Sequence, residues 1–143
     1  MDILITGAGR GLGKELARGF LKKGARVHGI VHNSTPEDLK AEFPKTFFTY
    51  KVDITKEEQL KEVAQEMAHT TSTLDILIND AAVHFENHRP DLENIDFSVY
   101  LPTFQVNSIA PLMVIRTFLC FLRNGKTRWI ANISSEAGSI SNA

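Results

Sequence analysis

The most constraining feature of this 143-residue sequence is a glycine-rich segment near its start, Thr6 to Gly13. It follows a short apolar run, Ile3 to Ile5, and precedes a stretch whose apolar residues recur about every four positions. The run predicts a buried strand, and the periodic stretch predicts a helix that ends at Gly24. Glycines in such a turn let the backbone approach a phosphate, and the helix N-terminus offers free N–H groups. The segment therefore predicts a phosphate-binding turn.

The spacing of these glycines can be compared with the sequence patterns of known phosphate-binding loops. The pattern Gly-x-Gly-x-x-Gly needs a glycine where Leu12 or Lys14 stands, and the P-loop pattern fails at Ala8 and Glu15. A turn whose glycines only permit tight packing of helix on sheet is the alternative, and the strand–turn–helix context disfavours it. The pattern that fits is Thr-Gly-x-x-x-Gly-x-Gly, formed by Thr6, Gly7, Gly11 and Gly13.

Apolar runs and amphipathic stretches alternate along the rest of the chain. This alternation predicts βαβ units, and so an α/β fold with a parallel sheet and helices on both of its faces. Ligands bind such sheets at the carboxyl ends of the strands. The expected strands are Ile3–Ile5, Val27–Val31, Phe47–Asp53, Leu74–Asn79 and Arg128–Ser134. The expected helices begin near Leu12, Thr35, Thr55 and Pro102, and the last of them reaches Leu122.

Composition argues against several other classes of protein. Hydrophobic residues make up 43% and charged residues 23%, as in globular domains. The net charge of −1 leaves no basic excess that would argue for binding to nucleic acid or an anionic membrane. No apolar run approaches the ~18 residues that span a bilayer, and the N-terminus does not resemble a signal peptide. The single cysteine, Cys120, cannot form an internal disulfide, so we expect a cytoplasmic protein. Its neighbours are apolar, so we expect a buried thiol. His84 and His88 lack a third ligand nearby, so we expect no metal site.

Together, these motifs resemble the classical short-chain dehydrogenase/reductase family, in order along the whole chain but over only about the first half of a family member. The resemblance implies a doubly wound, Rossmann-like parallel sheet with five strands in the order 3-2-1-4-5. Residues 1–143 would then be the N-terminal portion of a single domain whose C-terminal part is missing. The resemblance also implies an oxidoreductase that transfers hydride between a nicotinamide dinucleotide and a carbonyl or alcohol.

The resemblance assigns cofactor-binding roles to residues at the strand ends. Asp53 and Ile54 resemble the family's adenine-binding pair. The segment 79–82 reads Asn-Asp-Ala-Ala where the family usually has Asn-Asn-Ala-Gly, so Asp80 and Ala82 depart from the pattern. The expected cofactor-binding residues are Gly7, Arg10, Gly11, Leu12, Gly13, His32, Asp53, Ile54, Asn79 and Ala81.

Local charge bears on which dinucleotide binds. A family member that prefers NAD usually carries an acid at the end of the second strand, which bonds the ribose hydroxyls. Here Val31, His32 and Asn33 stand there, and Arg10 adds a positive charge within the glycine loop. Both features favour a 2′-phosphate, so we expect NADP rather than NAD.

Two catalytic residues are implied by the same resemblance. Asn107 resembles a helix asparagine whose carbonyl holds a water in a proton relay. Pro111 lacks an N–H and cannot bond that carbonyl, so the helix should kink there, and a plain proline kink is the alternative. Ser135 resembles the catalytic serine, whose hydroxyl would bond the substrate oxygen.

The family's Tyr-x-x-x-Lys pair, which supplies the general acid, has no counterpart in the sequence. Tyr50 is followed at that offset by Ile54, and Tyr100 by Phe104. We therefore expect a piece of a longer enzyme, homo-oligomeric when intact, that acts on a small carbonyl or alcohol. The alternative is a catalytically silent module that binds a dinucleotide or a partner protein.

Overall fold

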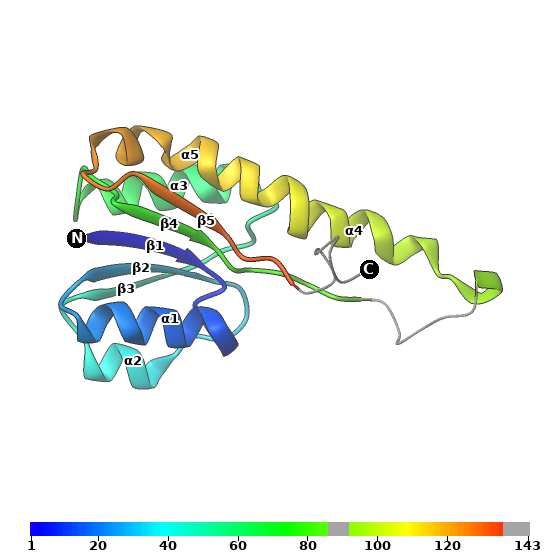
Figure 1. Ribbon diagram of the computed structural model, residues 1–143, viewed down its shortest axis with the longest axis horizontal. Coiled ribbons are helices and arrows are strands. Elements are labelled where there is room, and N and C mark those ends of the chain that lie inside the picture. The colour runs from blue at the N-terminus through cyan, green and yellow to red at the C-terminus, as the bar shows by residue number, and fades with distance from the viewer. Residues whose placement is uncertain (86–91, 136–143) are drawn as a thin grey trace.

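The computed structural model describes residues 1–85 and 92–135 (Figure 1). These residues contain five strands, β1 (Asp2–Thr6), β2 (Arg26–Val31), β3 (Phe47–Lys51), β4 (Ile76–Asn79) and β5 (Trp129–Asn132). The strands form one sheet in the order β3-β2-β1-β4-β5, and every neighbouring pair is parallel. The structure confirms the expected fold class and strand order, although three strands are shorter than the sequence suggested.

Helices cover both faces of the sheet (Figure 1). On one face lie α1 (Gly11–Lys22) and α2 (Glu37–Glu42), and on the other lie α3 (Glu57–Ala68) and α5 (Ala110–Asn124). Two short 3₁₀ helices, Leu92–Asn94 and Phe97–Val99, precede α4 (Tyr100–Phe104). Part of the segment 81–95, expected to be loop, is therefore helical, and residues 86–91 lie outside the described residues.

The strand side chains alternate between two apolar layers. Ile3 and Ile5 of β1 pack toward α1 and α2, whereas Leu4 between them packs toward α3 and α5. This alternation follows from the two-residue period of a strand. All five residues of β1 are buried, because the strand lies inside the sheet with helices above and below it. Central burial on both faces explains why its sequence is a continuous apolar run.

The long helix that follows is irregular where the sequence predicted a kink. A π-helical turn, Gln105–Ile109, joins α4 to α5, and the Ala110 N–H donates to the carbonyl of Gln105. Pro111 supplies no N–H, and its ring would press on the carbonyl four residues earlier in a regular α-helix. A wider turn relieves that conflict, and such turns often accompany function. The expected disturbance at Asn107 is thus a π turn.

The sheet-facing stripe of α5 consists of Ala110, Val114, Phe118 and Leu122, all buried. Cys120 lies off this stripe and is exposed, so the expectation of a buried thiol is wrong. By length and composition, the helical stretch 97–124 could also cross a membrane, and 22% of its most apolar window is buried. Core helices of water-soluble domains meet the same criterion, so this finding is weak evidence for a membrane span.

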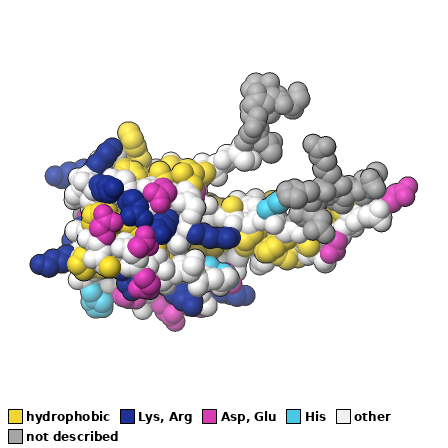
Figure 2. All heavy atoms as spheres, turned by 90° about the horizontal axis from the view of Figure 1, so that it is seen from below, with side chains coloured by type: hydrophobic (Ala, Val, Ile, Leu, Met, Phe, Trp, Pro, Cys, Tyr) yellow, Lys and Arg dark blue, Asp and Glu magenta, His cyan; other side chains and the backbone are white. Residues whose placement is uncertain are grey.

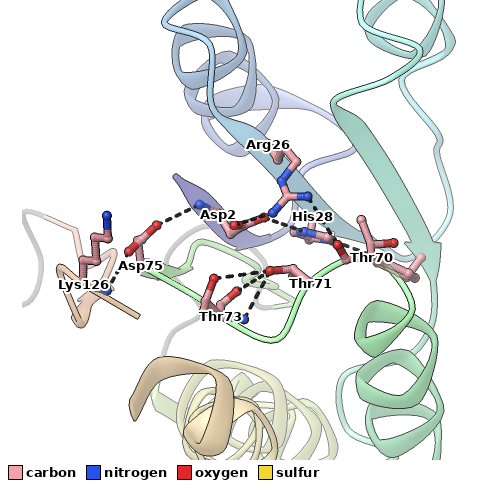
Figure 3. A network of polar contacts seen from close by, with 9 residues as sticks. Asp2, Arg26, His28, Thr70, Thr71, Thr73, Asp75 and Lys126 are labelled. Atoms are coloured by element: carbon pink, nitrogen blue, oxygen red, sulfur yellow. Dashed lines mark hydrogen bonds and ion pairs between the residues drawn. The ribbon is translucent and has the colours of Figure 1, made fainter. Parts of the chain in front are cut away.

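Polar side chains link β1, β2 and the residue before β4 at the amino ends of the strands (Figure 3). The Asp75 carboxylate accepts hydrogen bonds from the backbone N–H groups of Asp2 and Lys126. The Arg26 guanidinium bonds the Asp2 carboxylate at 2.8 Å. The fully buried His28 ring bonds the Tyr50 hydroxyl at 3.0 Å, and its Nε2 lies 3.5 Å from Asp2 Oδ1. This network lies at the opposite end of the strands from their carboxyl ends.

The outer surface of α1 and α2 carries interleaved acidic and basic side chains (Figure 2). Arg18 bonds Asp38 and Glu42 at 2.8 and 2.9 Å, and Lys14 Nζ lies 2.9 Å from Asp38 Oδ1. Lys14 and Arg18 together lower the pKa of Asp38 to about 2. These pairs hold α2 beside α1, and they engage the Lys14 ammonium.

Candidate functional site

A cavity of about 940 Å³ opens at the carboxyl ends of the strands. The glycine loop, the segments that follow β2, β3 and β4, and the start of the long helix all contribute to its wall. Its lining includes eight of the ten residues expected to bind a cofactor: Gly7, Arg10, Gly11, Leu12, His32, Asp53, Ile54 and Ala81. The structure therefore brings together residues that are up to 74 positions apart in the sequence (81 − 7 = 74).

The glycine loop leaves the first turn of α1 accessible. Gly11, the first residue of α1, has φ +58°, a conformation that favours glycine, and a Cβ there would meet nothing within 4 Å. Arg10, the N-cap residue, places no side-chain hydrogen bond on the helix. The first N–H groups of a helix have no partner within it, so this turn can receive an anion. The open approach at Gly11 and the cavity of about 940 Å³ beside it fit a dinucleotide.

Thr6 joins the glycine loop to the segment that follows β4. Its hydroxyl oxygen accepts hydrogen bonds from the backbone N–H groups of Asp80 and Ala81, both at 3.1 Å. A Cβ on Gly7 would lie 2.9 Å from the Ala81 nitrogen, so this close approach requires glycine. The two segments are thus held as one rigid wall of the cavity.

Asp80 departs from the family pattern, and it is also a direct contact of α1. Its carboxylate accepts a hydrogen bond from the Gly13 N–H, and a Cβ on Gly13 would lie 2.6 Å from Asp80 Oδ2. Gly13 is buried behind the loop and does not line the cavity. Burial raises the pKa of Asp80, and the Gly13 hydrogen bond only partly opposes that shift.

The exits of β2 and β3 form the other end of the cavity. His32 and Arg10 are both exposed and both line it. Asp53 Oδ1 accepts two hydrogen bonds from Thr55, at 2.9 Å from the backbone N and 2.7 Å from Oγ1. Partial burial opposes ionisation, but the bonds from Thr55 and the nearby His32 lower the pKa of Asp53. The Ile54 side chain is buried in the core, which fixes the backbone beside Asp53.

Besides Gly13, three of the expected residues do not line the cavity. The buried Asn79 side chain donates from Nδ2 to Asn132 Oδ1 at 2.8 Å, linking β4 to β5. The Asn107 amide pairs with the backbone of Val83, which itself lines the cavity, through bonds of 2.8 and 2.9 Å. Ser135 is exposed three residues after β5. Asn107 therefore supports the segment between β4 and the long helix, whereas Asn79 holds β5 beside β4.

Some lining residues were not singled out by the sequence. Ser34 extends the β2 exit, and the hydroxyl-rich run 34–35 could have signalled it. Phe85 and Gln105 line the cavity near the long helix, and nothing in the pattern of the sequence marks them. Within the described residues, no three His, Cys, Asp or Glu side chains gather as metal ligands, and His88 lies outside those residues.

Comparison with known proteins agrees with this geometry. The family model for short chain dehydrogenases matches residues 2–143. Estradiol 17-beta-dehydrogenase 2 of Rattus norvegicus is 33% identical over 96% of this chain and 37% of its own length. An NAD-dependent glycerol dehydrogenase of Listeria innocua is 29% identical over 96% of this chain and 53% of its own length.

A solved structure gives the same result. A short-chain dehydrogenase/reductase from Burkholderia multivorans with bound NADP superposes with a TM-score of 0.82, at 27% identity, over 99% of this chain and 61% of that one. The chain thus spans less than two thirds of the length of each of these relatives. Because the family model covers residues 2–143 and the fold superposes on a solved member, the chain belongs to the short-chain dehydrogenase family.

Proposed function

We propose that this protein is an NADP-dependent oxidoreductase, which transfers hydride between the nicotinamide and a small carbonyl or alcohol substrate. One observation carries the proposal. The glycine loop, the β2 exit and the β3 exit all line a single cavity at the carboxyl ends of the strands, which is where doubly wound sheets bind dinucleotides. We also propose that the protein is cytoplasmic.

Different residues along the cavity would bind different parts of the dinucleotide. The first turn of α1, at Gly11 and Leu12, would receive the pyrophosphate with its free N–H groups. Asp53 and the Ile54 backbone would hold the adenine. Arg10 and His32 would face a 2′-phosphate, and no acid stands among residues 31–34 to repel it. The relative with bound NADP supports this choice, while the NAD-dependent relative keeps NAD as the alternative.

The catalytic assignments concern two residues outside the cavity lining, one in the long helix and one after β5. The bound nicotinamide would supply or accept the hydride. Ser135 would donate a hydrogen bond to the substrate oxygen, and the Asn107 carbonyl would hold a water of the proton path. Tyr50 is buried and bonded to His28, and Tyr100 lacks a lysine four residues later, so neither fits the general acid. These 143 residues would bind dinucleotide, and turnover would need an acid–base pair that they do not supply.

The decisive experiment is a calorimetric titration of the full chain with NADPH and with NADH. Gly11→Asp should abolish binding of both, because it forces a side chain into the left-handed backbone and places a negative charge at the phosphate turn. Gly19→Asp is the matched control. Gly19 is exposed on α1, and a Cβ there would also meet nothing within 4 Å. No binding by the unmodified chain, or equal binding by the Gly11 variant, would overturn the proposal.

A further inference from the structure

The proposed function does not use the Asp80 carboxylate. This side chain comes from the segment after β4, yet it caps the start of α1. Asp80 follows β4, yet it accepts the hydrogen bond of Gly13, the third residue of α1. The side chain of Arg10, the N-cap residue, makes no such capping hydrogen bond. Asp80 also lines the cavity that the glycine loop borders. One carboxylate thus occupies the helix end that the dinucleotide would use.

The segments nearest Asp80 in the sequence and in the cavity wall carry three basic side chains. Arg10 lines the same cavity as Asp80, Lys14 follows Gly13 and is paired with Asp38, and His84 comes four residues after Asp80. Burial raises the pKa of Asp80, the Gly13 N–H lowers it, and no basic side chain of the described segments adds a further lowering. The Gly13 N–H at the start of α1 is therefore the group that favours the ionised carboxylate.

A phosphate drawn to the free N–H groups of Gly11 and Leu12 would share that helix end with Asp80. The end of a helix carries the equivalent of roughly half a positive charge, which favours one anion there far more than two. Two negative groups in a partly buried site repel each other, and such a pair relieves the repulsion by binding a proton. Dinucleotide and proton should therefore bind together.

We propose that Asp80 is a further cofactor-facing residue, which weakens dinucleotide binding when ionised and couples binding to the uptake of one proton. The inference rests on the proposed function, because it requires a dinucleotide at the glycine loop. The proton goes to the Asp80 carboxyl group, which keeps its place beside Gly13 in the neutral form.

The test compares the full chain with its Asp80→Asn variant, which is isosteric and still accepts from the Gly13 N–H. NADH is the probe, because it lacks the 2′-phosphate, a group that would itself titrate in this pH range. Calorimetry from about pH 5 to about pH 8, in two buffers of different ionisation enthalpy, gives the Kd and the protons taken up. We expect the unmodified chain to lose affinity as pH rises and to take up protons. The variant should bind roughly tenfold more tightly at the upper pH and take up fewer protons.

Asp96→Asn is the matched control, since Asp96 is an exposed aspartate that accepts from the Ser98 N–H at a helix start away from the cavity. It should retain the pH dependence of the unmodified chain. Identical pH dependence in the unmodified chain and the Asp80 variant would overturn the inference and leave the proposed function standing. No binding of NADH by the unmodified chain would overturn both.

A second measurement does not depend on the variant. The side-chain carboxyl carbon of Asp80, followed by NMR in the unmodified chain, should titrate above the ordinary aspartate pKa of about 3.9. Saturation with NADH should move that titration to still higher pH. A titration that NADH leaves unchanged would overturn the inference even if the variant fails to fold.

Discussion

At the scale of single residues, Arg10 bears most directly on the choice of cofactor. It is exposed in the glycine loop and lines the same cavity as His32. We predict that Arg10→Ala weakens NADPH binding by roughly tenfold, because a charge-assisted hydrogen bond to phosphate is lost, and weakens NADH binding much less. Fluorescence titration with both cofactors measures the difference. Arg123→Ala, on the exposed end of α5, is the control, and equal losses for the two cofactors would refute the NADP assignment.

His28 is a buried histidine that should make stability depend on pH. Burial lowers its pKa, and the attraction of Asp2 only partly offsets this. The unfolded chain therefore binds a proton near pH 6.5 that the folded chain resists, so stability is complete above that pH and falls as pH drops below it. We predict a lower free energy of unfolding in urea at about pH 5.5 than at about pH 8.

The variant His28→Phe should reduce that pH dependence, because phenylalanine binds no proton. Its ring can keep the stack on Phe48, where the ring centroids are 5.1 Å apart. His69→Gln, on the exposed end of α3, should leave it intact. The comparison uses the change of stability with pH, so a constant loss from the Tyr50 hydrogen bond does not affect it. An unchanged slope in the His28 variant would show that other groups are responsible.

At the scale of elements, the packing of α5 on the sheet depends on its buried stripe. Phe118 is fully buried in the core shared with α3, whereas Phe97 is 73% exposed. We predict that Phe118→Ala lowers the free energy of unfolding by about 3–5 kcal/mol, since it removes a large side chain and leaves a cavity. Phe97→Ala should change it by less than about 0.5 kcal/mol. Chemical denaturation of both variants decides the point, and similar losses would contradict the assigned packing.

The π turn ties the long helix to the cavity wall through Asn107. Its amide makes two hydrogen bonds to the backbone of Val83. Asn107→Leu should speed hydrogen exchange at the Val83 amide and cost about 1 kcal/mol for each bond lost. Asn124→Leu, which removes a hydrogen bond to Ser72, is the control and should leave Val83 unaffected. Unchanged exchange at Val83 would show that the cavity wall is held by other contacts.

The elements also show what the sequence alone can and cannot predict. The apolar run at Ile3–Ile5 and the glycine spacing after it predicted β1, α1 and the turn between them, because these depend on local patterns. The spacing of Pro111 from Asn107 predicted a disturbed helix, but its form as a π turn depends on neighbouring contacts. The exposure of Cys120 depends on which stripe of α5 meets the sheet, and an apolar helix has more than one such stripe.

The candidate site was predictable to a similar extent. The strand-end positions of Arg10 and Asp53 follow from the parallel sheet, so the sequence placed them at one edge. The hydrogen bond between Asp80 and Gly13 joins residues that are 67 positions apart (80 − 13 = 67), and no local pattern announces it. The bond between Asn79 and Asn132 is of the same kind. Such contacts depend on the assembled sheet.

At the scale of the whole molecule, apolar side chains remain uncovered along one side. β5 is at the edge of the sheet, with Trp129 66% and Ile130 43% exposed. Leu112 of α5 is 67% exposed, and apolar side chains also lie open along the helical arm that projects from the sheet (Figure 2). An edge strand with free backbone groups beside apolar surface favours association.

We therefore predict that the 143-residue polypeptide self-associates, and that Leu112→Lys with Trp129→Lys shifts it toward monomer. A charge on an edge strand opposes pairing with another strand, and a charge on the open face of α5 opposes burial there. Gln65→Lys with Asn124→Lys adds the same charge at exposed polar positions and is the matched control. Sedimentation velocity over a range of concentrations measures the result. Equal effects of the two pairs would assign the association to net charge, and no effect of either would place it elsewhere on the surface.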